Sequence, residues 1–253
     1  MQFAFGDQTV TVNMPTRVAL FREIKRRFAE RRGFALATVN LDHLVKLSED
    51  AAFAQVYAAQ DLIVADGRPI VALSRMAQRP VDLMPGSDLV RPLCALAAES
   101  GARVALVGSS DQALADAKAI LVADTPGLEI VYCCAPAYGF DPNGKIAEGI
   151  LLALNDAGVQ LCFLALGAPK QENLALRGRR LAPQVGFASV GAGLDFLGGH
   201  QVRAPVWVRK IALEWLWRAC SNPVRLFPRY AKCALILPGH MMRAFKLRNV
   251  AQD

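Results

Sequence analysis

The sequence has few of the residues that bind metals or form disulfide frameworks. It contains three widely spaced histidines and six cysteines, and no two cysteines form a Cys-x-x-Cys pair. Because structural zinc sites gather four Cys or His ligands at short spacings, we expect no metal site. The cysteines lie mostly in apolar runs, which predicts reduced core cysteines in a cytosolic protein. They are Cys94, Cys133, Cys134, Cys162, Cys220 and Cys233.

Long apolar segments and the common nucleotide-binding motifs are also missing. No run of about 18 uncharged apolar residues exists, and the N-terminus lacks the pattern of a signal peptide, so we expect neither a transmembrane helix nor a leader. The GxGxxG motif does not follow the first expected strand, and GxxxxGK[ST] occurs nowhere. A dehydrogenase or P-loop ATPase is therefore disfavoured, while a nucleotide held by other means remains open.

The chain does have enough apolar residues for a large core. It has 253 residues, of which 53% are hydrophobic, enough for one large α/β domain. Short apolar runs alternate with helical stretches, which predicts a mostly parallel sheet with helices on both faces. The expected strands are 34–40, 61–65, 103–107, 128–134, 160–166 and 187–190, after a hairpin at 2–13. The expected helices are 15–32, 87–100, 111–123, 143–157 and 169–181, and residues 42–60 are expected to form one or two helices.

Positive charge is concentrated at the C-terminal end. Residues 201–253 hold ten Lys or Arg against two acidic residues, a net of +8, which leaves −1 for residues 1–200. The composition also changes near residue 200, where the chain becomes rich in Arg, Trp and Pro. We therefore divide the chain into a core at 1–200 and a basic, helical C-terminal appendage at 201–253, and expect an anionic partner for the appendage.

A single carboxylate ends one of the expected core strands. Asp66 follows the apolar run 61–65 and is followed at once by Gly67. Open α/β sheets place their chemistry at such strand ends, and a carboxylate there is costly to desolvate unless it is used. An ordinary Asp-Gly turn is the competing interpretation.

Other expected strands also end in glycine and polar residues. Thr38 and Asn40 end one strand, and Gly191 precedes a second acid, Asp195. If the strands before Asp66 and Asp195 are neighbours, their two carboxylates face one pocket.

Two further strand ends have backbone features that suit an anionic ligand. Gly108 begins a Gly-Ser-Ser turn before a helix, which is either a phosphate site or simply a tight turn. Gly167 lets the backbone approach a ligand before Lys170, Gln171 and Glu172 start a helix. The alternative for that segment is helix capping by Gln171 and Glu172.

The appendage interleaves arginines with aromatic residues. Arg203, Arg218, Arg225 and Arg229 alternate with tryptophan, phenylalanine and tyrosine, a composition typical of a membrane surface element. A helical hairpin packed on the core with a solvated basic face is the alternative. The segment is too apolar to track nucleic-acid phosphates, so we expect no nucleic-acid partner.

Ten short motifs, in order along the chain, resemble those of the WecG/TagA/CpsF glycosyltransferases, glycosyltransferase family 26. They are Thr38-x-Asn40, Ala65-Asp66-Gly67, Gly86-x-Asp88-Leu89, Val107-Gly108, Gly167-x-Pro169-Lys170-Gln171-Glu172, Gly191-Ala192-Gly193-x-Asp195-Phe196, Gly199, Arg203-Ala204-Pro205-x-Trp207, Glu214-Trp215-x-x-Arg218 and Pro223-x-Arg225-x-x-x-Arg229-Tyr230.

The resemblance implies a Rossmann-like fold and an inverting transfer of a sugar from a UDP-sugar to an acceptor on a membrane polyprenyl-diphosphate lipid. It implies Asp66 as general base, with Thr38, Gln171 and Asp195 in the pocket. We assign Asn40, Gly67, Gly108, Gly167, Lys170, Glu172 and Gly191 to substrate binding as well. The basic appendage is expected to close over the site and dock on the anionic inner face of the bacterial cytoplasmic membrane. A homo-oligomer is compatible with this interpretation.

One position departs from the family pattern. The family usually has Arg three residues before the glycine that matches Gly86, and here that residue is Leu83. Arg75 or Arg79 are the candidate replacements for holding the donor diphosphate. The departure leaves the transferred sugar open among N-acetylmannosamine, glucose and related sugars. Two rival functions are a non-catalytic UDP-sugar-binding module and a soluble nucleotide-sugar-modifying enzyme.

Overall fold

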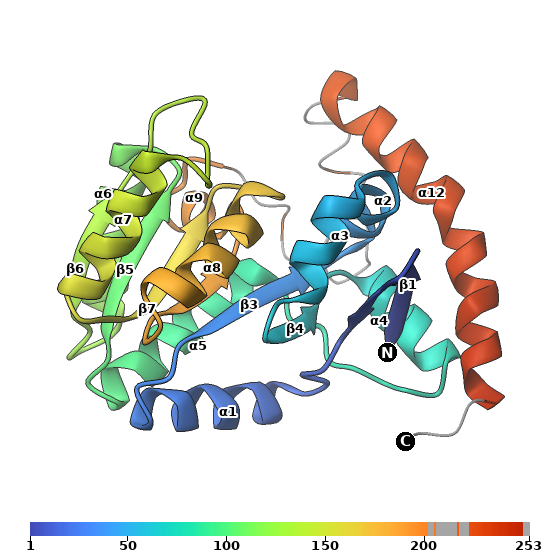
Figure 1. Cartoon of the computed structure of the whole chain (residues 1–253), viewed down its shortest axis with the longest axis horizontal. Coiled ribbons are helices and arrows are strands. Elements are labelled where there is room, and N and C mark those ends of the chain that lie inside the picture. The colour runs from blue at the N-terminus through green and yellow to red at the C-terminus, as the bar shows by residue number, and fades with distance from the viewer. Residues whose placement is uncertain (202–204, 206–216, 218–222, 250–253) are drawn as a thin grey trace.

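A six-stranded parallel sheet forms the centre of the molecule (Figure 1). The structure is a computed structural model that describes residues 1–201, 205, 217 and 223–249. The strand order is β4-β3-β8-β7-β5-β6, and every pairing between neighbours is parallel. The strands are β3 (Phe34–Val39), β4 (Leu62–Ala65), β5 (Arg103–Gly108), β6 (Ile130–Cys134), β7 (Val159–Ala165) and β8 (Gly186–Ser189).

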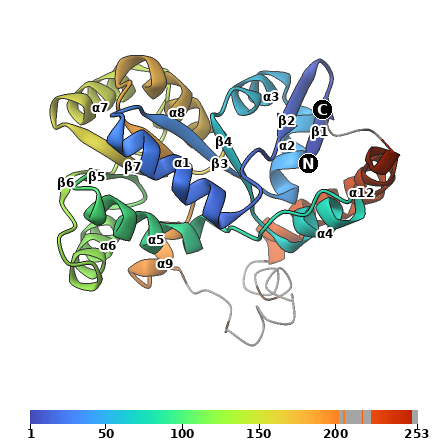
Figure 2. The same cartoon turned by 90° about the horizontal axis from the view of Figure 1, so that it is seen from below.

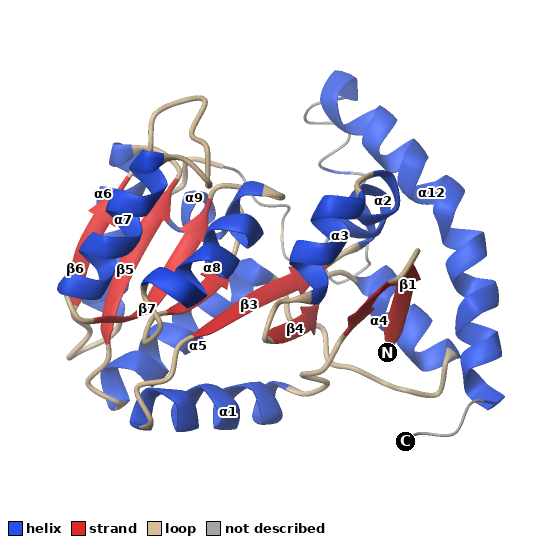
Figure 3. Cartoon of the chain, in the orientation of Figure 1, coloured by secondary structure: helices blue, strands red, loops and turns tan. Residues whose placement is uncertain are grey.

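Helices follow most of these strands, and a small antiparallel hairpin precedes them (Figure 3). The hairpin pairs β1 (Gln2–Phe5) with β2 (Gln8–Thr11). The helices are α1 (Arg17–Ala29), α2 (Leu41–Glu49), α3 (Ala51–Ala58), α4 (Arg68–Met76), α5 (Gly86–Glu99), α6 (Asp111–Asp124), α7 (Lys145–Asp156), α8 (Lys170–Leu181), α9 (Gly193–Leu197) and α12 (Pro223–Lys246), followed by the 3-10 turn η1 (Leu247–Asn249).

Alternation of side chains along the strands divides the core between the two faces of the sheet. Leu36, Leu106 and Phe163 pack with α1, α5, α6 and α9, whereas Ala105 and its neighbours in β7 pack with α7 and α8. Figure 2 shows the two helix layers on opposite sides of the strands. Because both faces are covered, the strands read in sequence as continuous apolar runs rather than as alternating ones.

A third apolar cluster lies beyond strands β3 and β4. It joins Val39 and Ala65 to the hairpin, α2, α3, α4 and α12. In α12, Ala244 is fully buried there, and the His240 ring lies 5.7 Å from that of Phe3. Lys232 Nζ contacts Glu49 Oε1 at 2.7 Å. The described C-terminal helix therefore packs on the first residues of the chain (Figure 1).

The α/β architecture predicted from the sequence is confirmed, including the hairpin and all six strands. The segment 42–60, expected to form one or two helices, forms two, because Asp50 interrupts it with an extended backbone and caps α3 through a hydrogen bond from Phe53 N. Helix α4 was not predicted. Its core-facing residues, Ile70 and Leu73, follow helical spacing, but the run is short and begins at Arg68-Pro69.

The cysteines agree only in part with the prediction. Cys94, Cys162 and Cys233 are buried and unpaired, but Cys133 is exposed on the edge strand β6, where alternate side chains face solvent. Within the described ranges, no helix is both long enough and apolar enough to cross a bilayer.

Candidate active site

Five strand ends singled out in the sequence belong to five consecutive strands of the sheet. Asp66 follows β4, Asn40 follows β3, Gly191 lies just after β8, Gly167 lies after β7 and Gly108 ends β5. Parallel strands bring their carboxyl ends to the same edge, where open α/β sheets bind ligands. The candidate residues are therefore gathered along one edge of the sheet.

Asp66 sits at a junction between a strand and a helix rather than in a simple turn. Its backbone N–H donates to Val39 O at 2.7 Å and extends the pairing of β4 with β3. Gly67 then adopts φ +103°, a conformation that favours glycine, and α4 starts at Arg68. This sharp change of direction leaves Asp66 half-buried at the sheet edge.

The end of β3 is occupied by Thr38 and Asn40. Thr38 is buried, and Asn40 caps α2 by accepting from His43 N at 3.0 Å. Asn40 N donates in return to His43 Nδ1 at 3.3 Å. Desolvation by burial lowers the pKa of His43 to about 4, so its ring is neutral at pH 7. His43 was not predicted as a site residue, because its only signal in the sequence is its position three residues after the capping Asn40.

The Gly167–Glu172 segment leads from β7 into α8. Gly167 has φ +71°, and the Ala168–Pro169 peptide bond is cis. Gln171 Oε1 does not cap α8 but accepts from Gly191 N, in the loop after β8, at 3.2 Å. For Gln171, the structure thus favours a link between two loops of the site over the capping alternative. Lys170 at the start of α8 is half-buried.

Glu172 lies behind Gln171 and does not reach the surface. Its side chain is fully buried, and its Oε1 accepts from Gln171 Nε2 at 2.8 Å. Burial raises the pKa of Glu172 to about 7, against the lowering effects of Gln171 and Lys46. Burial and the charges of Glu172 and Asp66 also raise the pKa of Tyr57.

Asp195 is held over the end of β5. It accepts hydrogen bonds from Ser109 Oγ and, at 2.9 Å, from Gln201 Nε2. Ser109 has φ +54° and directly follows Gly108, whose φ is +117°. The strands that precede Asp66 and Asp195 are β4 and β8, which are not neighbours because β3 lies between them.

Leu83 lies beside the end of β4. It forms a parallel bridge with Ala65, the residue before Asp66, and is 36% exposed. The proposed replacements for the family arginine lie elsewhere. Arg75 is in the last turn of α4, about 10 Å along the axis from Arg68 at 1.5 Å per residue. Arg79 lies near the Met1 amino group, and its positive charge helps to lower the pKa of that group.

Of the four arginines selected in the appendage, Arg229 has a described side chain. Arg203 and Arg218 lie outside the described residues, and Arg225 belongs to α12 but its side chain is not described. Arg229 Nε contacts Asp42 Oδ1 of α2 at 2.5 Å. Asp42 also pairs at 3.2 Å with Lys46, whose Nζ donates to Ala168 O at 3.3 Å. This chain of contacts connects α12 to the loop between β7 and α8.

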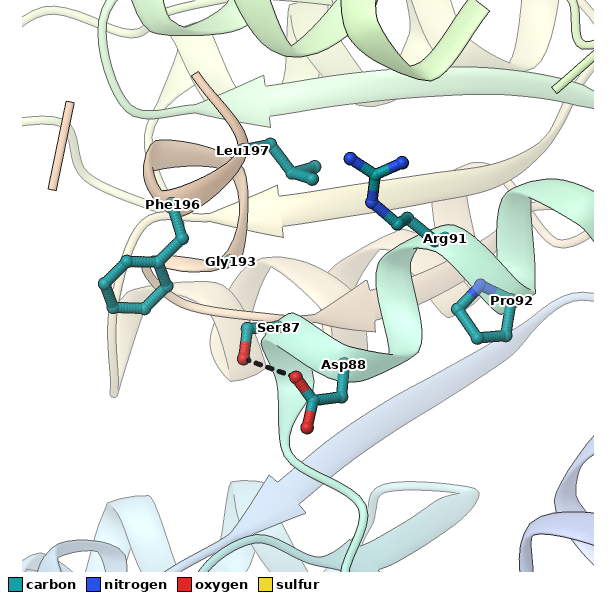
Figure 4. Close-up of a pocket in the computed structure, with 7 residues that line it drawn as sticks. All are labelled: Ser87, Asp88, Arg91, Pro92, Gly193, Phe196 and Leu197. Atoms are coloured by element: carbon teal, nitrogen blue, oxygen red, sulfur yellow. Dashed lines mark hydrogen bonds between the residues drawn. The ribbon is translucent and has the colours of Figure 1, made fainter. Parts of the chain in front are cut away.

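A cavity of about 430 Å³ lies between the start of α5 and α9 (Figure 4). In Figure 4, Ser87 Oγ donates to Asp88 Oδ1 across 3.4 Å at the α5 side of the cavity. None of the predicted site residues lines it, although α9 also carries Asp195. Its lining residues are Ser87, Asp88, Arg91, Pro92, Gly193, Phe196 and Leu197. Across the described part of the chain, no three His, Cys, Asp or Glu side chains are grouped so as to hold a metal.

Comparison with known proteins is in line with this arrangement. The model of the glycosyl transferase WecG/TagA/CpsF family matches residues 8–251, nearly the whole chain. The chain belongs to the WecG/TagA/CpsF family. The matched residues include both the six-stranded sheet and α12.

Two relatives from Bacillus are named for their activity. The protein of Bacillus spizizenii strain W23 is 27% identical over 212 residues, which cover 81% of this chain and 80% of the relative. The protein of Bacillus subtilis strain 168 is 26% identical over 219 residues, which cover 83% and 82%. Both are N-acetylglucosaminyldiphosphoundecaprenol N-acetyl-beta-D-mannosaminyltransferases. This WecG/TagA/CpsF protein is thus similar, over most of its length, to enzymes that transfer a sugar to a lipid-linked acceptor.

Proposed function

We propose that this protein is an inverting glycosyltransferase that moves a sugar from a UDP-sugar to an acceptor carried on a polyprenyl diphosphate. The observation that carries the proposal is the position of Asp66. Its carboxylate lies at the edge of the sheet formed by the carboxyl ends of five consecutive parallel strands. Family membership and the acceptors named for the Bacillus relatives support it.

The proposed reaction needs one base. An acceptor hydroxyl has a pKa far above 7, so Asp66 takes its proton as the oxygen attacks C1 of the donor sugar. The bond from C1 to the UDP oxygen breaks at the same time, and UDP leaves with the bonding electrons. One carboxylate suffices for such a single displacement, and a general base contributes about 10²–10⁴-fold to the rate.

The leaving UDP carries negative charge that the site must stabilise. The positive end of the α8 dipole lies at its first turn, next to Gly167, and that turn begins with the half-buried Lys170. Arg68, which the sequence analysis did not select, begins α4 two residues after Asp66. We propose that these groups and the basic appendage, rather than a bound metal ion, neutralise the diphosphate.

Replacing Asp66 by Asn tests the role of the base. Asp66→Asn keeps the side-chain shape but cannot take a proton, so UDP release in the presence of lipid-linked acceptor should fall about 10²–10⁴-fold. UDP binding, measured by calorimetry, should stay within about threefold. Asp61→Asn, at the opposite end of the same strand, is the control. Turnover of Asp66→Asn close to that of the unchanged protein would refute the assignment.

A screen of UDP-sugars against lipid-diphosphate acceptors identifies the substrates. N-acetylmannosamine is the first candidate donor sugar because the Bacillus relatives transfer it, and glucose and related sugars follow because Leu83 departs from the family pattern. Running each pair with and without EDTA tests whether a metal is needed. UDP binding without release for any pair would favour a non-catalytic binding module, and release without lipid would favour a soluble sugar-modifying enzyme.

The surface of α12 supports placement at the inner face of the cytoplasmic membrane. Its most exposed apolar residues recur on one side of the helix, at successive spacings of 3, 8, 7 and 3 residues: Val224, Phe227, Leu235, Met242 and Phe245. Its buried residues Cys233, His240 and Ala244 lie on the opposite side, against the core. Arg243 and Lys246 flank the apolar stripe. A helix of this kind suits an interface of anionic headgroups and acyl chains.

A further inference from the structure

Gln171 joins two parts of the site through the opposite ends of its amide. Its Nε2 donates to Glu172 Oε1 at 2.8 Å, and its Oε1 accepts from Gly191 N at 3.2 Å. A carboxylate only accepts hydrogen bonds, and a backbone N–H only donates. The two partners therefore fix which way the Gln171 amide points, and exchanging its two ends would break both contacts.

The loop that Gln171 holds leads directly to Asp195. Gly191 and Ala192 connect β8 to α9, in which Asp195 is the third residue. At the other end, Gln60 Nε2 donates to Glu172 O at 3.2 Å and fixes the backbone of Glu172 to the segment just after α3. A line of contacts thus runs from the interior of the protein, through Glu172 and Gln171, to the loop that carries a pocket residue.

We propose that Glu172 is a positioning residue, whose buried carboxylate orients Gln171 and, through it, the Gly191–Asp195 loop of the active site. It does not contact substrate, because its side chain is fully buried behind Gln171. The catalytic consequence of this inference rests on the proposed transferase function, whereas the structural link does not.

The surroundings of Glu172 make this link sensitive to pH. The ionisable groups that face it are His43 and Lys46 of α2 and Tyr57 of α3, and Asp66 after β4 acts on the same Tyr57. His43 Nε2 lies 4.0 Å from Glu172 Oε1, and the lowered pKa of His43, about 4, keeps it neutral. Burial raises the pKa of Tyr57, so it also stays neutral.

Glu172 is therefore the member of this buried group that changes charge near pH 7, where burial has moved its pKa. A charged carboxylate accepts a stronger hydrogen bond than a protonated one. The hydrogen bond from Gln171 Nε2 to Glu172 is therefore stronger above pH 7 than below it.

A structural measurement tests the link without any assay of activity. In ¹⁵N NMR spectra from pH 5.5 to 8.5, the Gly191 backbone amide and the Gln171 side-chain amide should shift together, with a midpoint near pH 7. In Glu172→Gln both signals should stay constant over that range. Glu99→Gln removes an equally charged but exposed carboxylate and should titrate like the unchanged protein. Signals that do not titrate in the unchanged protein, or that still titrate in Glu172→Gln, would overturn the proposal.

A kinetic measurement tests the consequence for the site. Above pH 8, Glu172→Gln should lower kcat for UDP release roughly fivefold, the factor expected when a charged hydrogen bond becomes neutral. Below pH 6 the kcat values of the two proteins should converge, because Glu172 is then protonated and, like glutamine, carries no charge. A loss of equal size at all pH values would mean a merely structural role and would overturn the proposal.

The two measurements also separate this inference from the proposed function. If no protein releases UDP but the NMR titration is seen, the transferase assignment fails and the Glu172–Gln171 link stands. If the unchanged protein releases UDP and Glu172→Gln matches it at every pH, the positioning role of Glu172 in catalysis fails and the transferase assignment stands.

Discussion

At the residue scale, the interior of the site contains two ionisable side chains whose pKa values move in opposite directions. Burial raises the pKa of Glu172 to about 7 and lowers that of His43 to about 4. In model peptides the histidine would hold its proton more tightly than the glutamate does. In the folded protein the order is reversed, so at pH 6 the proton lies on Glu172 and both side chains are neutral. Burial explains this, since a low-dielectric interior disfavours each charged form.

Glu172 should therefore make the stability of the protein depend on pH. Its pKa is about 7 in the folded state against 4.5 as the model value, so between these values the folded state binds more protons. Its contribution to stability is fully present below pH 4.5 and is lost as pH rises through 7. At pH 8, Glu172→Gln should be more stable than the unchanged protein by up to about 3 kcal/mol, since one pKa unit corresponds to about 1.4 kcal/mol.

Urea unfolding at pH 5 and pH 8 measures this difference. The gain in the free energy of unfolding for Glu172→Gln should be present at pH 8 and nearly absent at pH 5. Glu99→Gln, which alters an exposed carboxylate, should change little at either pH. If Glu172→Gln is less stable than the unchanged protein at pH 8, the groups around Glu172 stabilise its charged form more than its raised pKa indicates.

At the element scale, the close approach of β5 to β7 decides the shape of the site edge beside Asp195. A Cβ on Gly108 would lie 2.5 Å from the backbone C and O of Ala165, and the Gly108 φ of +117° is strained for other residues. Both features require glycine at the end of β5. The tight-turn interpretation of Gly108 therefore has a physical basis that does not depend on any ligand.

Gly108→Ala should lower the free energy of unfolding by at least about 2 kcal/mol, because it adds backbone strain and a clash with β7. Gly149→Ala is the matched control. Gly149 lies in α7 with open space around its Cα, so alanine there should stabilise the helix by about 0.5–1 kcal/mol. Thermal or urea unfolding compares the two. Equal changes in the free energy of unfolding for the two variants would mean that β5 can move away from β7 without loss of stability.

Sequence patterns predict the individual strands but not their order in the sheet. The apolar runs predict each strand, because a strand covered on both faces is apolar throughout. They do not predict which strand lies next to which, since neighbours such as β3 and β8 are distant in sequence. Whether Asp66 and Asp195 follow neighbouring strands depended on that order, and β3 lies between the two strands. Arg75 and Arg79, the candidates to replace the family arginine that is absent at position 83, were chosen by their distance along the sequence. That distance does not show where they lie in the folded protein.

At the scale of the whole molecule, the C-terminal helix returns to the start of the chain. One side of α12 shares the core with the hairpin, α2 and α4, and the other presents the apolar stripe. Removal of the chain after residue 200 would therefore expose part of the core as well as removing the stripe. Substitutions on the outward side of α12 give a cleaner test of membrane binding than truncation does.

Replacing Phe227, Leu235 and Met242 by Ser should reduce binding to anionic phospholipid vesicles roughly tenfold or more, because each large apolar side chain that enters the interface contributes about 1.5–3 kcal/mol. Vesicle sedimentation measures the bound fraction. The matched control replaces three exposed apolar residues elsewhere, Val18, Ile146 and Leu152, and should bind as the unchanged protein does.

The same variants also test a second use of the stripe. If the triple variant keeps its vesicle binding but changes from oligomer to monomer in solution, the stripe joins copies of the chain and our membrane assignment for α12 is wrong. Unfolding measurements should show the variant to be as stable as the unchanged protein, because the three substituted side chains are exposed.

The sequence by itself determined most of the secondary structure, the α/β class, the family and the residues at the strand ends, because these follow from local hydrophobic patterns and short motifs. Only the tertiary structure decided the strand order, the placement of Glu172 behind Gln171 and the packing of α12 on the first residues. These features depend on contacts between residues far apart in the chain. Burial, which gives Glu172 and His43 their altered pKa values, exists only once those contacts have formed.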